Sequence, residues 1–402
     1  MPLDTGDTSF MLVATALVMI MTPGLAFFYG GLVSRKNVLA IMMQSYVSMG
    51  VSTILWVTVG YSLCFSGDVG GIIGNLDMAF LRGIGSSDLY GGADGTIPLL
   101  LFVAYQMMFA IITPALITGA FANRITFKAY LIFLVAWQIL VYYPFVHMIW
   151  GGGMLADWGV LDFAGGIVVH ALAGMAALAS VIYVGKRRVE DAGAHNVPFV
   201  AIGAALLWFG WFGFNAGSEL AVDEVTAVAF INTQIAAAFA AITWLLLAWL
   251  YDRKPSFVEL LIGMIAGLAT ITPAAGFVSP QSAMLIGVAA GAVCYFAVVF
   301  RKKKGLDDAL DVWGVHGVGG ALGIIMLGVL ASESIGGQNG LYHGNQDFFM
   351  VQLAGLALAC VWAFAFTYGM LMMIDMITPV RVTDEAEAAL DVTLHGESAY
   401  ID

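Results

Sequence analysis

Residues 162–174 read DFAGGIVVHALAG, a mostly apolar stretch that opens with an aspartate and carries a histidine near its middle. Apolar sequence continues beyond it to about residue 185. A helix needs about 20 mostly apolar residues to cross a bilayer. The stretch therefore predicts the start of a membrane-spanning helix that carries the titratable ring of His170.

The whole chain has the composition of an integral membrane protein. Of its 402 residues, 61% are hydrophobic and 10% are charged, whereas soluble domains have roughly 45–50% apolar and about 25% charged residues. The net charge of −12 argues against nucleic acid as a partner. The three cysteines lie singly in apolar runs without the spacing of a metal site or a disulfide framework. The N-terminal segment lacks the basic region of a cleavable signal peptide.

The same length criterion, applied along the chain, predicts an all-α protein with eleven membrane-spanning helices. Gly and Pro interrupt the third, fifth and eighth spans, which membrane helices tolerate. The predicted spans are residues 9–31, 38–65, 98–122, 128–148, 163–185, 197–217, 225–251, 257–276, 281–300, 312–331 and 348–378.

The basic residues predict the orientation of these spans. Of the 15 lysines and arginines, all except Arg82 fall in alternate loops or just after the last span. Cytoplasmic loops carry an excess of Lys and Arg, so we expect a multi-pass protein of the cell membrane with its N-terminus outside and its C-terminus inside. We expect a membrane domain over residues 1–379 and an acidic cytoplasmic tail over residues 380–402.

Two sequence echoes indicate an internal repeat. ITPALITGAF (112–121) in span three is echoed by ITPAAGF (271–277) in span eight, and the opening stretch in span five by DVWGVHGVGG (311–320) in span ten. Each pair lies five spans apart, and because five is odd the second half has the opposite orientation. We therefore predict an inverted repeat of spans 1–5 and 6–10, with span eleven outside it. In transporters this arrangement places the substrate route between the halves.

His170 and His316 are the ionisable residues that lie well inside the predicted spans. A charge at the bilayer centre costs about 2.5–3.5 kcal/mol, so ionisable groups there indicate function. A lone core histidine is often structural, but two at matching positions of a repeat favour a shared role. Two imidazoles alone do not make a zinc site. They can exchange protons near neutral pH or stay neutral and bond to each other, in a pore that suits a small neutral species better than a bare cation.

Aromatic side chains gather toward the predicted outer face. Tyr105 and Phe109 lie one turn apart in span three, Phe214 and Ser218 lie one turn apart in span six, and Trp150 follows span four. A cation over an aromatic ring gains roughly 0.5–2 kcal/mol, which makes these rings candidates for a cation entrance. The alternative is the interfacial aromatic belt that membrane proteins commonly have.

Asp162 is expected to have a structural role. It lies eight residues before His170, about 12 Å along a helix at 1.5 Å per residue, which is too far for direct proton exchange. An aspartate at a helix start accepts hydrogen bonds from free backbone N–H groups. We therefore expect Asp162 to cap the helix that carries His170.

Taken in order, these segments resemble the ammonium transporter family, which is related to the Rhesus proteins. The resemblance covers nearly the whole chain. The matching segments are TPGLAFFYGGLVSRKN (22–37), FAIITPALITGAF (109–121), YYPFVHMIWGGGML (142–155), DFAGGIVVHALAGMAAL (162–178), WFGFNAGS (211–218), TPAAGFVSP (272–280), DVWGVHGVGGALG (311–323) and HGESAY (395–400).

The resemblance implies a binding site at the entrance. In the family an aromatic residue, a tryptophan and a serine bind ammonium at the outer face, and these correspond here to Tyr105, Trp150 and Ser218. The first of them is often phenylalanine, so Tyr105 adds a hydroxyl group. Two stacked phenylalanines gate the family's pore, and they correspond to Phe109 and Phe214.

The resemblance also implies the inner part of the pore. The family's twin histidines correspond to His170 and His316, and its aspartate at the start of span five corresponds to Asp162. Trp313 stands where the family commonly has phenylalanine. The family forms homotrimers with one pore per subunit, and a PII signalling protein blocks many members from the cytoplasm.

The function implied is ammonium transport without a resident cofactor or metal. In that interpretation NH4+ is captured outside and deprotonated, NH3 crosses an apolar pore, and the histidine pair relays the proton; methylammonium would serve as a substrate analogue. Two alternatives are a passive NH3 channel and an ammonium sensor in which transport is secondary. A membrane enzyme is a weaker alternative, because no nucleophile, metal ligand or cofactor motif accompanies the histidines.

Overall fold

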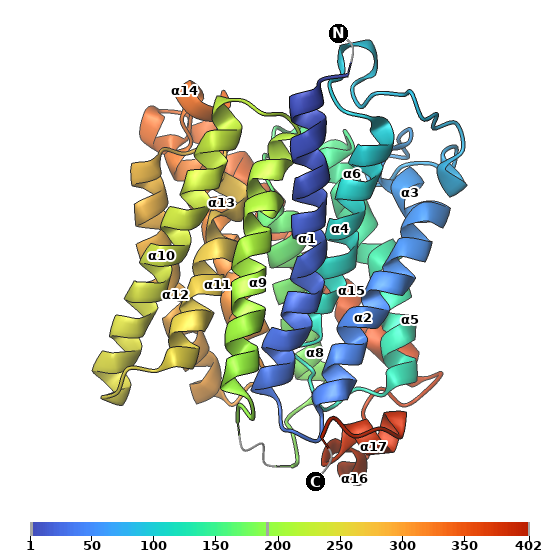
Figure 1. The fold of residues 1–402 in the computed structure, drawn as a ribbon, viewed down its shortest axis with the longest axis vertical. Helices are drawn as coiled ribbons and strands as arrows, with labels where there is room; N and C mark the ends of the chain where they lie inside the picture. Colours follow the sequence, from blue (N-terminus) through green and yellow to red (C-terminus); the bar gives the residue numbers. More distant parts are fainter. Residues whose placement is uncertain (1–2, 190–192, 401–402) are drawn as a thin grey trace.

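A computed structural model describes residues 3–189 and 193–400, and these ranges are helical without any strand. The ends of the predicted membrane domain and tail, residues 1–2 and 401–402, and residues 190–192 of one loop lie outside the described residues. Figure 1 shows a bundle of long helices with the two chain ends at opposite ends of the bundle. We call these ends the N-terminal face and the C-terminal face.

The prediction of eleven spans is confirmed for the described part of the chain, where eleven helical segments are long and apolar enough to cross a membrane. The first five are α1 (Thr5–Leu32), α2 with η1 and α3 (Val38–Leu55, Trp56–Gly60, Tyr61–Phe65), α4 (Leu99–Ile117), α5 with η4, α6 and α7 (Phe127–Trp137, Gln138–Tyr142, Tyr143–Trp150, Met154–Asp157), and η5 with α8 (Gly166–Ala171, Leu172–Val184). The remaining six are α9 (Val197–Ala216), α10 (Glu224–Asp252), α11 (Phe257–Ile271), α12 (Pro280–Lys304), η8 with α13 (Trp313–Gly317, Val318–Leu330) and α15 (Gln346–Asp375).

Short helices fill the connections and the tail or continue a span. They are η2 (Ala79–Leu81), η3 (Gly92–Asp94), η6 (Gly217–Glu219), η7 (Thr272–Ala274), α14 (Glu333–Gly336), η9 (Leu341–His343), α16 (Asp384–Glu387) and α17 (Leu390–His395). Two of them, η6 and η7, continue spans six and eight. Span three is shorter than predicted, because the chain leaves the helix after Ile117 and turns through Asn123, whose φ is 68°.

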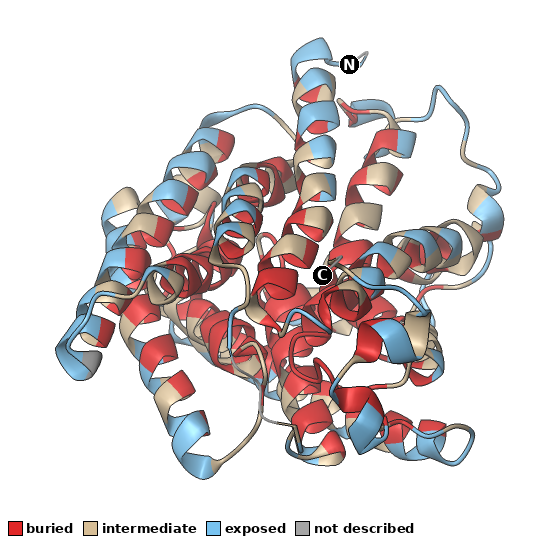
Figure 2. Ribbon diagram, turned by 60° about the horizontal axis from the view of Figure 1, so that its bottom comes forward, coloured by how far each residue is buried: buried red, intermediate tan, exposed pale blue. Residues whose placement is uncertain are grey.

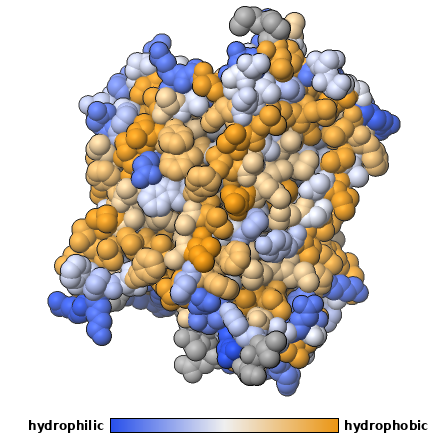
Figure 3. All heavy atoms as spheres, in the orientation of Figure 1, coloured by the Kyte–Doolittle hydropathy of each residue, from blue (hydrophilic) through white to orange (hydrophobic). Residues whose placement is uncertain are grey.

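The surface of the bundle is that of a membrane protein. In Figure 3 a hydrophobic belt occupies the middle of the visible face, and hydrophilic residues gather at its two ends. Figure 2 shows buried residues concentrated in the interior and exposed ones on the outward side of the helices. With no water in the bilayer core, each spanning segment must satisfy its own backbone groups, which a helix does.

The close helix contacts follow the repeat. Spans one and six pack along their length as α1 against α9, where a methyl group placed on Gly203 would lie 2.2 Å from the backbone nitrogen of Phe28. Spans five and ten also touch through backbone, since a methyl group on Gly174 would lie 2.0 Å from the Cα atom of Gly317. Small residues let membrane helices approach this closely. Equivalent spans of the two halves therefore pair at the centre of the molecule.

The tail is bound to the C-terminal face. The carboxylate of Asp391 accepts hydrogen bonds from Leu39 N–H at 3.0 Å and Ala40 N–H at 2.8 Å, at the start of α2. Glu387 accepts from Arg188 N–H at 2.6 Å and from the Arg381 guanidinium at 2.9 Å. The tail thereby holds the loops that follow spans one and five.

Candidate functional site

His170 and His316 face each other at the centre of the bundle. Their Nδ1 atoms are 3.2 Å apart and their rings stack with centroids 5.2 Å apart. Both side chains are buried, at 1% and 4% exposure. Since a neutral imidazole has one donor and one acceptor nitrogen, one of the two Nδ1 atoms donates to the other. The pair therefore shares a single hydrogen bond, and the Nε2 atoms remain for other partners.

Residue counts along the spans do not predict that the two histidines touch. They touch because their helices begin in the interior of the protein. Spans five and ten begin inside the protein, after irregular segments at residues 158–165 and 305–312. Each helix opens with a π-helical turn, and each histidine lies on that turn. π-Helical turns are often found at functional sites. Each histidine therefore sits one turn from a helix start that has already reached the interior.

Asp162 fixes the start of the helix that carries His170. Its two carboxylate oxygens accept hydrogen bonds from four successive backbone N–H groups, of residues 165–168, at 2.6 to 3.1 Å. The residue directly before the helix is Gly165, at φ 113°. The helix itself therefore starts at Gly166, four residues after the aspartate. Burial raises the pKa of Asp162, while the four N–H groups act to lower it.

Asp308 is the counterpart of Asp162 in the second half. It lies eight residues before His316, as Asp162 lies eight before His170, and its Oδ2 accepts from Trp313 N–H at 2.7 Å. Its Oδ1 is buried without a hydrogen-bond partner among the described residues. Burial and the neighbouring Asp311 raise the pKa of Asp308 to about 6. The sequence echo at 311–320 begins at Asp311, three residues after this counterpart.

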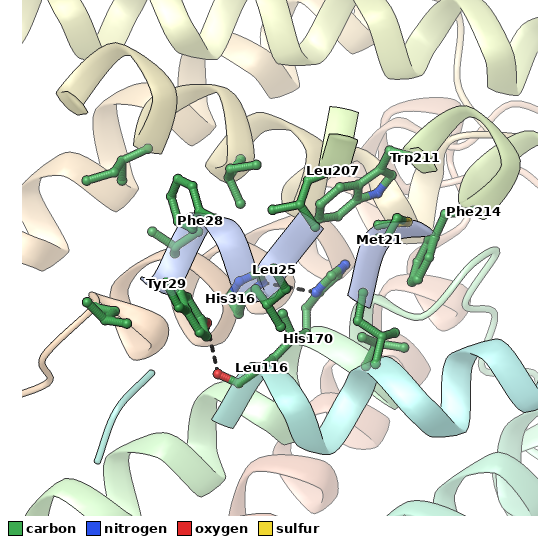
Figure 4. Close-up of a pocket in the computed structure, with 16 residues that line it drawn as sticks. Met21, Leu25, Phe28, Tyr29, Leu116, His170, Leu207, Trp211, Phe214 and His316 are labelled. Atoms are coloured by element: carbon green, nitrogen blue, oxygen red, sulfur yellow. Dashed lines mark hydrogen bonds between the residues drawn. The ribbon is translucent and has the colours of Figure 1, made fainter. Parts of the chain in front are cut away.

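The two histidines line a narrow cavity. Its volume is about 20 Å³, and about 10–15 Å³ on this measure accommodates one water-sized molecule. Figure 4 shows His170 and His316 among side chains that are mostly apolar, including Met21, Leu25 and Leu207. Within the described residues, His170 Nε2 is buried without a hydrogen-bond partner. The cavity therefore offers a passing molecule little polarity beyond that of the imidazoles.

A line of aromatic rings leads from the N-terminal face to the histidines. Trp150 and Phe109 have centroids 6.0 Å apart, Phe109 and Phe214 are 4.3 Å apart with an angle of 33°, and Phe214 and His170 are 6.0 Å apart. Trp150 is partly exposed, whereas Phe109 and Phe214 are buried. The two phenylalanines, which come from spans three and six, close the path between Trp150 and His170.

Trp150 and Ser218 border two pockets at the outer end of this line, with volumes of about 350 and 250 Å³. Tyr105 lies elsewhere: it is fully buried and lines neither pocket. Its hydroxyl lies 3.2 Å from Ser218 Oγ, and it donates toward the carbonyl of Gly213 at 2.9 Å. The structure thus places Tyr105 behind Ser218, with its hydroxyl against the serine and the backbone of span six.

The same aspartate connects the entrance to the histidines. The indole N–H of Trp150 donates to the backbone carbonyl of Asp162 at 2.8 Å. Gln352 of α15 holds the neighbouring Leu161 through both of that residue's backbone groups, at 2.8 and 2.7 Å. The segment at 158–165 therefore fixes the outer tryptophan and the helix of His170 together.

Two further pore residues were not singled out from the sequence. Trp211 stacks on His170 with centroids 5.5 Å apart and donates its indole N–H to Thr272 at 2.9 Å. Tyr29 lines the cavity from α1 and donates its hydroxyl to the Leu116 carbonyl at 2.9 Å. Trp211 opens the segment 211–218, in which Phe214 and Ser218 were predicted to belong to the entrance. Tyr29 has no polar neighbour in sequence that would identify it as a pore residue.

Comparison with known proteins identifies the family. Residues 9–400 match the Ammonium Transporter Family. The ammonium transporter of Bacillus subtilis (strain 168) is 46% identical, in an alignment that covers all of both chains. The crystal structure of Candida albicans Mep2 superposes with a TM-score of 0.90 at 33% identity, over 99% of this chain and 93% of the other.

A sensor is among the similar structures. A sensor Amt protein has a TM-score of 0.89 and 29% identity, over 97% of this chain and 98% of the other. The architecture is therefore shared by transporters and by at least one sensor. The family model covers residues 9–400, and the Bacillus subtilis relative aligns over the full length of both chains, so this chain belongs to the ammonium transporter family of membrane transport proteins.

Proposed function

We propose that this chain captures NH4+ at the N-terminal face, deprotonates it, conducts NH3 through the central cavity and relays the proton through His170 and His316. The observation that carries the proposal is the hydrogen-bonded histidine pair in an otherwise apolar cavity of about 20 Å³. An intact cation there would lose its water without compensation. NH3 is neutral and the size of a water molecule.

Capture is assigned to the pockets beside Trp150 and Ser218. The Trp150 ring supplies a face for a cation, worth roughly 0.5–2 kcal/mol, and Ser218 Oγ supplies an acceptor. Tyr105 contributes by holding Ser218, and Phe109 with Phe214 forms the barrier that the substrate passes. Potassium binds the same ring but cannot give up a proton, so it stops at this barrier.

The proton is assigned to the shared hydrogen bond. If His170 accepts a proton on Nε2 and releases one from Nδ1 to Nδ1 of His316, His316 becomes cationic. Release of the Nε2 proton of His316 toward the C-terminal face then completes the transfer and leaves the two tautomers exchanged. Imidazoles are suited to this transfer near neutral pH. The gain in rate expected from a well-placed proton-transfer group is about 10²–10⁴-fold.

Topology and partners complete the proposal. Fourteen of the 15 basic residues, all but Arg82, belong to loops, helix ends or the tail at the C-terminal face, and by the positive-inside rule that face is cytoplasmic. We assign the chain to the cell membrane, with a membrane domain at 1–379 and a cytoplasmic tail at 380–402. The proposals that the chain forms a homotrimer and binds a cytoplasmic PII protein are based on the resemblance to the family.

The test is the ammonium-evoked current of proteoliposomes on a solid-supported membrane. We expect His170→Ala and His316→Ala each to lower the current about 100-fold, and His343→Ala, an exposed histidine of the N-terminal face, to leave it unchanged. Wild-type current in both pore variants would contradict the relay.

The alternatives give different results in the same vesicles. A passive channel shows NH3 flux without current. The other alternative is an ammonium sensor, and a sensor Amt protein is among the similar structures. A sensor shows neither current nor uptake of methylammonium.

A further inference from the structure

The membrane-facing surface between α5 and α15 carries a groove that the transport path does not use. Its volume is about 730 Å³, within the roughly 300–1,000 Å³ of small-molecule sites. Ile132, Ala136 and Leu140 line one side, and Gly369 and Met373 belong to the other. The groove is therefore built on two spanning segments that are far apart in the sequence.

The dimensions of the groove match one leaflet of a bilayer. From Ile132 to Leu140 is eight residues, about 12 Å at 1.5 Å per residue, and half of a hydrocarbon core of about 30 Å is about 15 Å. The deep end lies near the middle of α15, and the other end reaches Met376 and Ile377, which are exposed just beyond the helix. The groove thus runs from the C-terminal face to the bilayer middle, the path of an acyl chain.

The floor of the groove leaves space for an acyl chain. No described atom lies within 4 Å of a methyl group placed on Gly369. Met373 is 68% exposed beside it. Methionine side chains are flexible and adapt to irregular apolar partners.

A lysine stands at the shallow end. Lys128 is exposed in the first turn of α5 and precedes Ile132 and Ala136 by four and eight residues, so the three lie on one helix face. Among residues 3–189 and 193–400 it forms no ion pair. Asp375 is the acidic residue at this end of α15, and its carboxylate accepts from Val380 N–H and Tyr183 OH. Both Asp375 oxygens are therefore occupied by donors of the protein, whereas the exposed ammonium of Lys128 is available to an anionic ligand.

We propose that this groove is a binding site for an anionic phospholipid, with one acyl chain between α5 and α15 and the phosphate at Lys128. The site is separate from the pore and does not depend on the proposed transport mechanism. A lysine near the surface of an anionic leaflet contributes about 1 kcal/mol. That corresponds to about a fivefold preference for an anionic over a zwitterionic headgroup.

The experiment measures lipid binding to the full chain after delipidation, by native mass spectrometry with phosphatidylglycerol or phosphatidylcholine of identical chains. Gly369→Leu fills the groove. Its matched control is Gly50→Leu, an exposed glycine of α2 whose added methyl group also meets no described atom within 4 Å. We expect Gly369→Leu to weaken binding of the first phosphatidylglycerol at least about fivefold, and Gly50→Leu to leave it unchanged.

Lys128→Gln tests the headgroup without altering the groove. We expect it to remove the roughly fivefold preference for phosphatidylglycerol while phosphatidylcholine binding stays as in wild type. Lys302→Gln, at an exposed lysine near the C-terminal end of α12, is the control and should keep the preference. Equal preference in the two glutamine variants would overturn the proposal. So would wild-type lipid binding by Gly369→Leu, or a change in its oligomeric state, which would make the groove a contact between copies.

Discussion

Spans five and ten each deliver one histidine to the central cavity, but their aspartates are in different surroundings. Asp162 has both oxygens occupied by four backbone N–H groups. Asp308 binds Trp313 N–H through one oxygen and leaves the other buried without a partner among the described residues. The spacing of aspartate to histidine, eight residues in both, is the same. The two halves thus place their histidine rings at the same distance in sequence from an aspartate, but the hydrogen bonding of that aspartate differs between the halves.

The largest effect is expected where the two spans touch. Gly174→Val puts a branched side chain against the backbone of Gly317, where even a methyl group would be 2.0 Å from Cα. Overpacking a rigid core costs about 1–3 kcal/mol or more, and here the strain separates the histidines. We expect ammonium-evoked current to fall to background, with a lower yield of folded protein. Gly50→Val, at an exposed glycine of α2, is the control, and a Gly174→Val protein with full current would refute the close crossing.

The second effect compares the two aspartates directly. Asp162→Ala leaves four N–H groups without their acceptor, and bonds to charged groups contribute about 1.5–3 kcal/mol each. We therefore expect a loss of at least about 3 kcal/mol in the free energy of unfolding. Asp308→Ala removes one short bond together with an unpaired buried oxygen, so its loss should be smaller. Denaturant titration of both variants in one detergent tests the order, and equal losses would show that the halves are supported alike.

The third effect is a pH dependence of stability that Asp308 contributes in the second half. Because the pKa of Asp308 is raised to about 6, the folded state binds its proton more tightly than the unfolded state, whose aspartate titrates near 3.9. Ionised Asp308 destabilises the folded state above about pH 6, and the penalty is relieved as the pH falls from about 6 to 4, by at most about 3 kcal/mol. Asp308→Asn should remove this gain. The check is the wild-type minus variant difference in unfolding midpoint between pH 7 and pH 4.5, which a flat difference would contradict.

The fold was largely predictable because membrane spans obey a simple length rule. Predicted and observed boundaries agree within a few residues for most spans. The larger differences occur where the chain turns inside the protein. Span three ends early at Ile117, and span four continues past the predicted end to Asp157 through short helices joined at Gly151 to Gly153. Hydropathy does not record such turns, because glycine-rich turns inside the protein remain apolar.

The site was less accessible to sequence reasoning. His170 and His316 stood out as ionisable groups in apolar spans, but their contact depends on helices that begin inside the protein. The substrate-binding role of Tyr105 stays a prediction, and the sequence did not reveal that its hydroxyl bonds to backbone carbonyls of span six behind Ser218. Trp211 was overlooked because a tryptophan in an apolar span is usually core. The roles of the entrance residues and of the histidine pair in transport stay proposals.

The bond between Asp391 and the start of α2 has a consequence for how the chain is made. Asn37, the residue that precedes α2, makes no capping bond with its side chain, and the acceptor for Leu39 N–H lies 352 residues later. During synthesis α2 enters the membrane long before its cap leaves the ribosome. A chain that stops short of residue 391 carries an uncapped second span and loosely held loops at the C-terminal face. Complete and incomplete chains therefore differ in stability at that face, which membrane proteases that remove unfinished proteins can recognise.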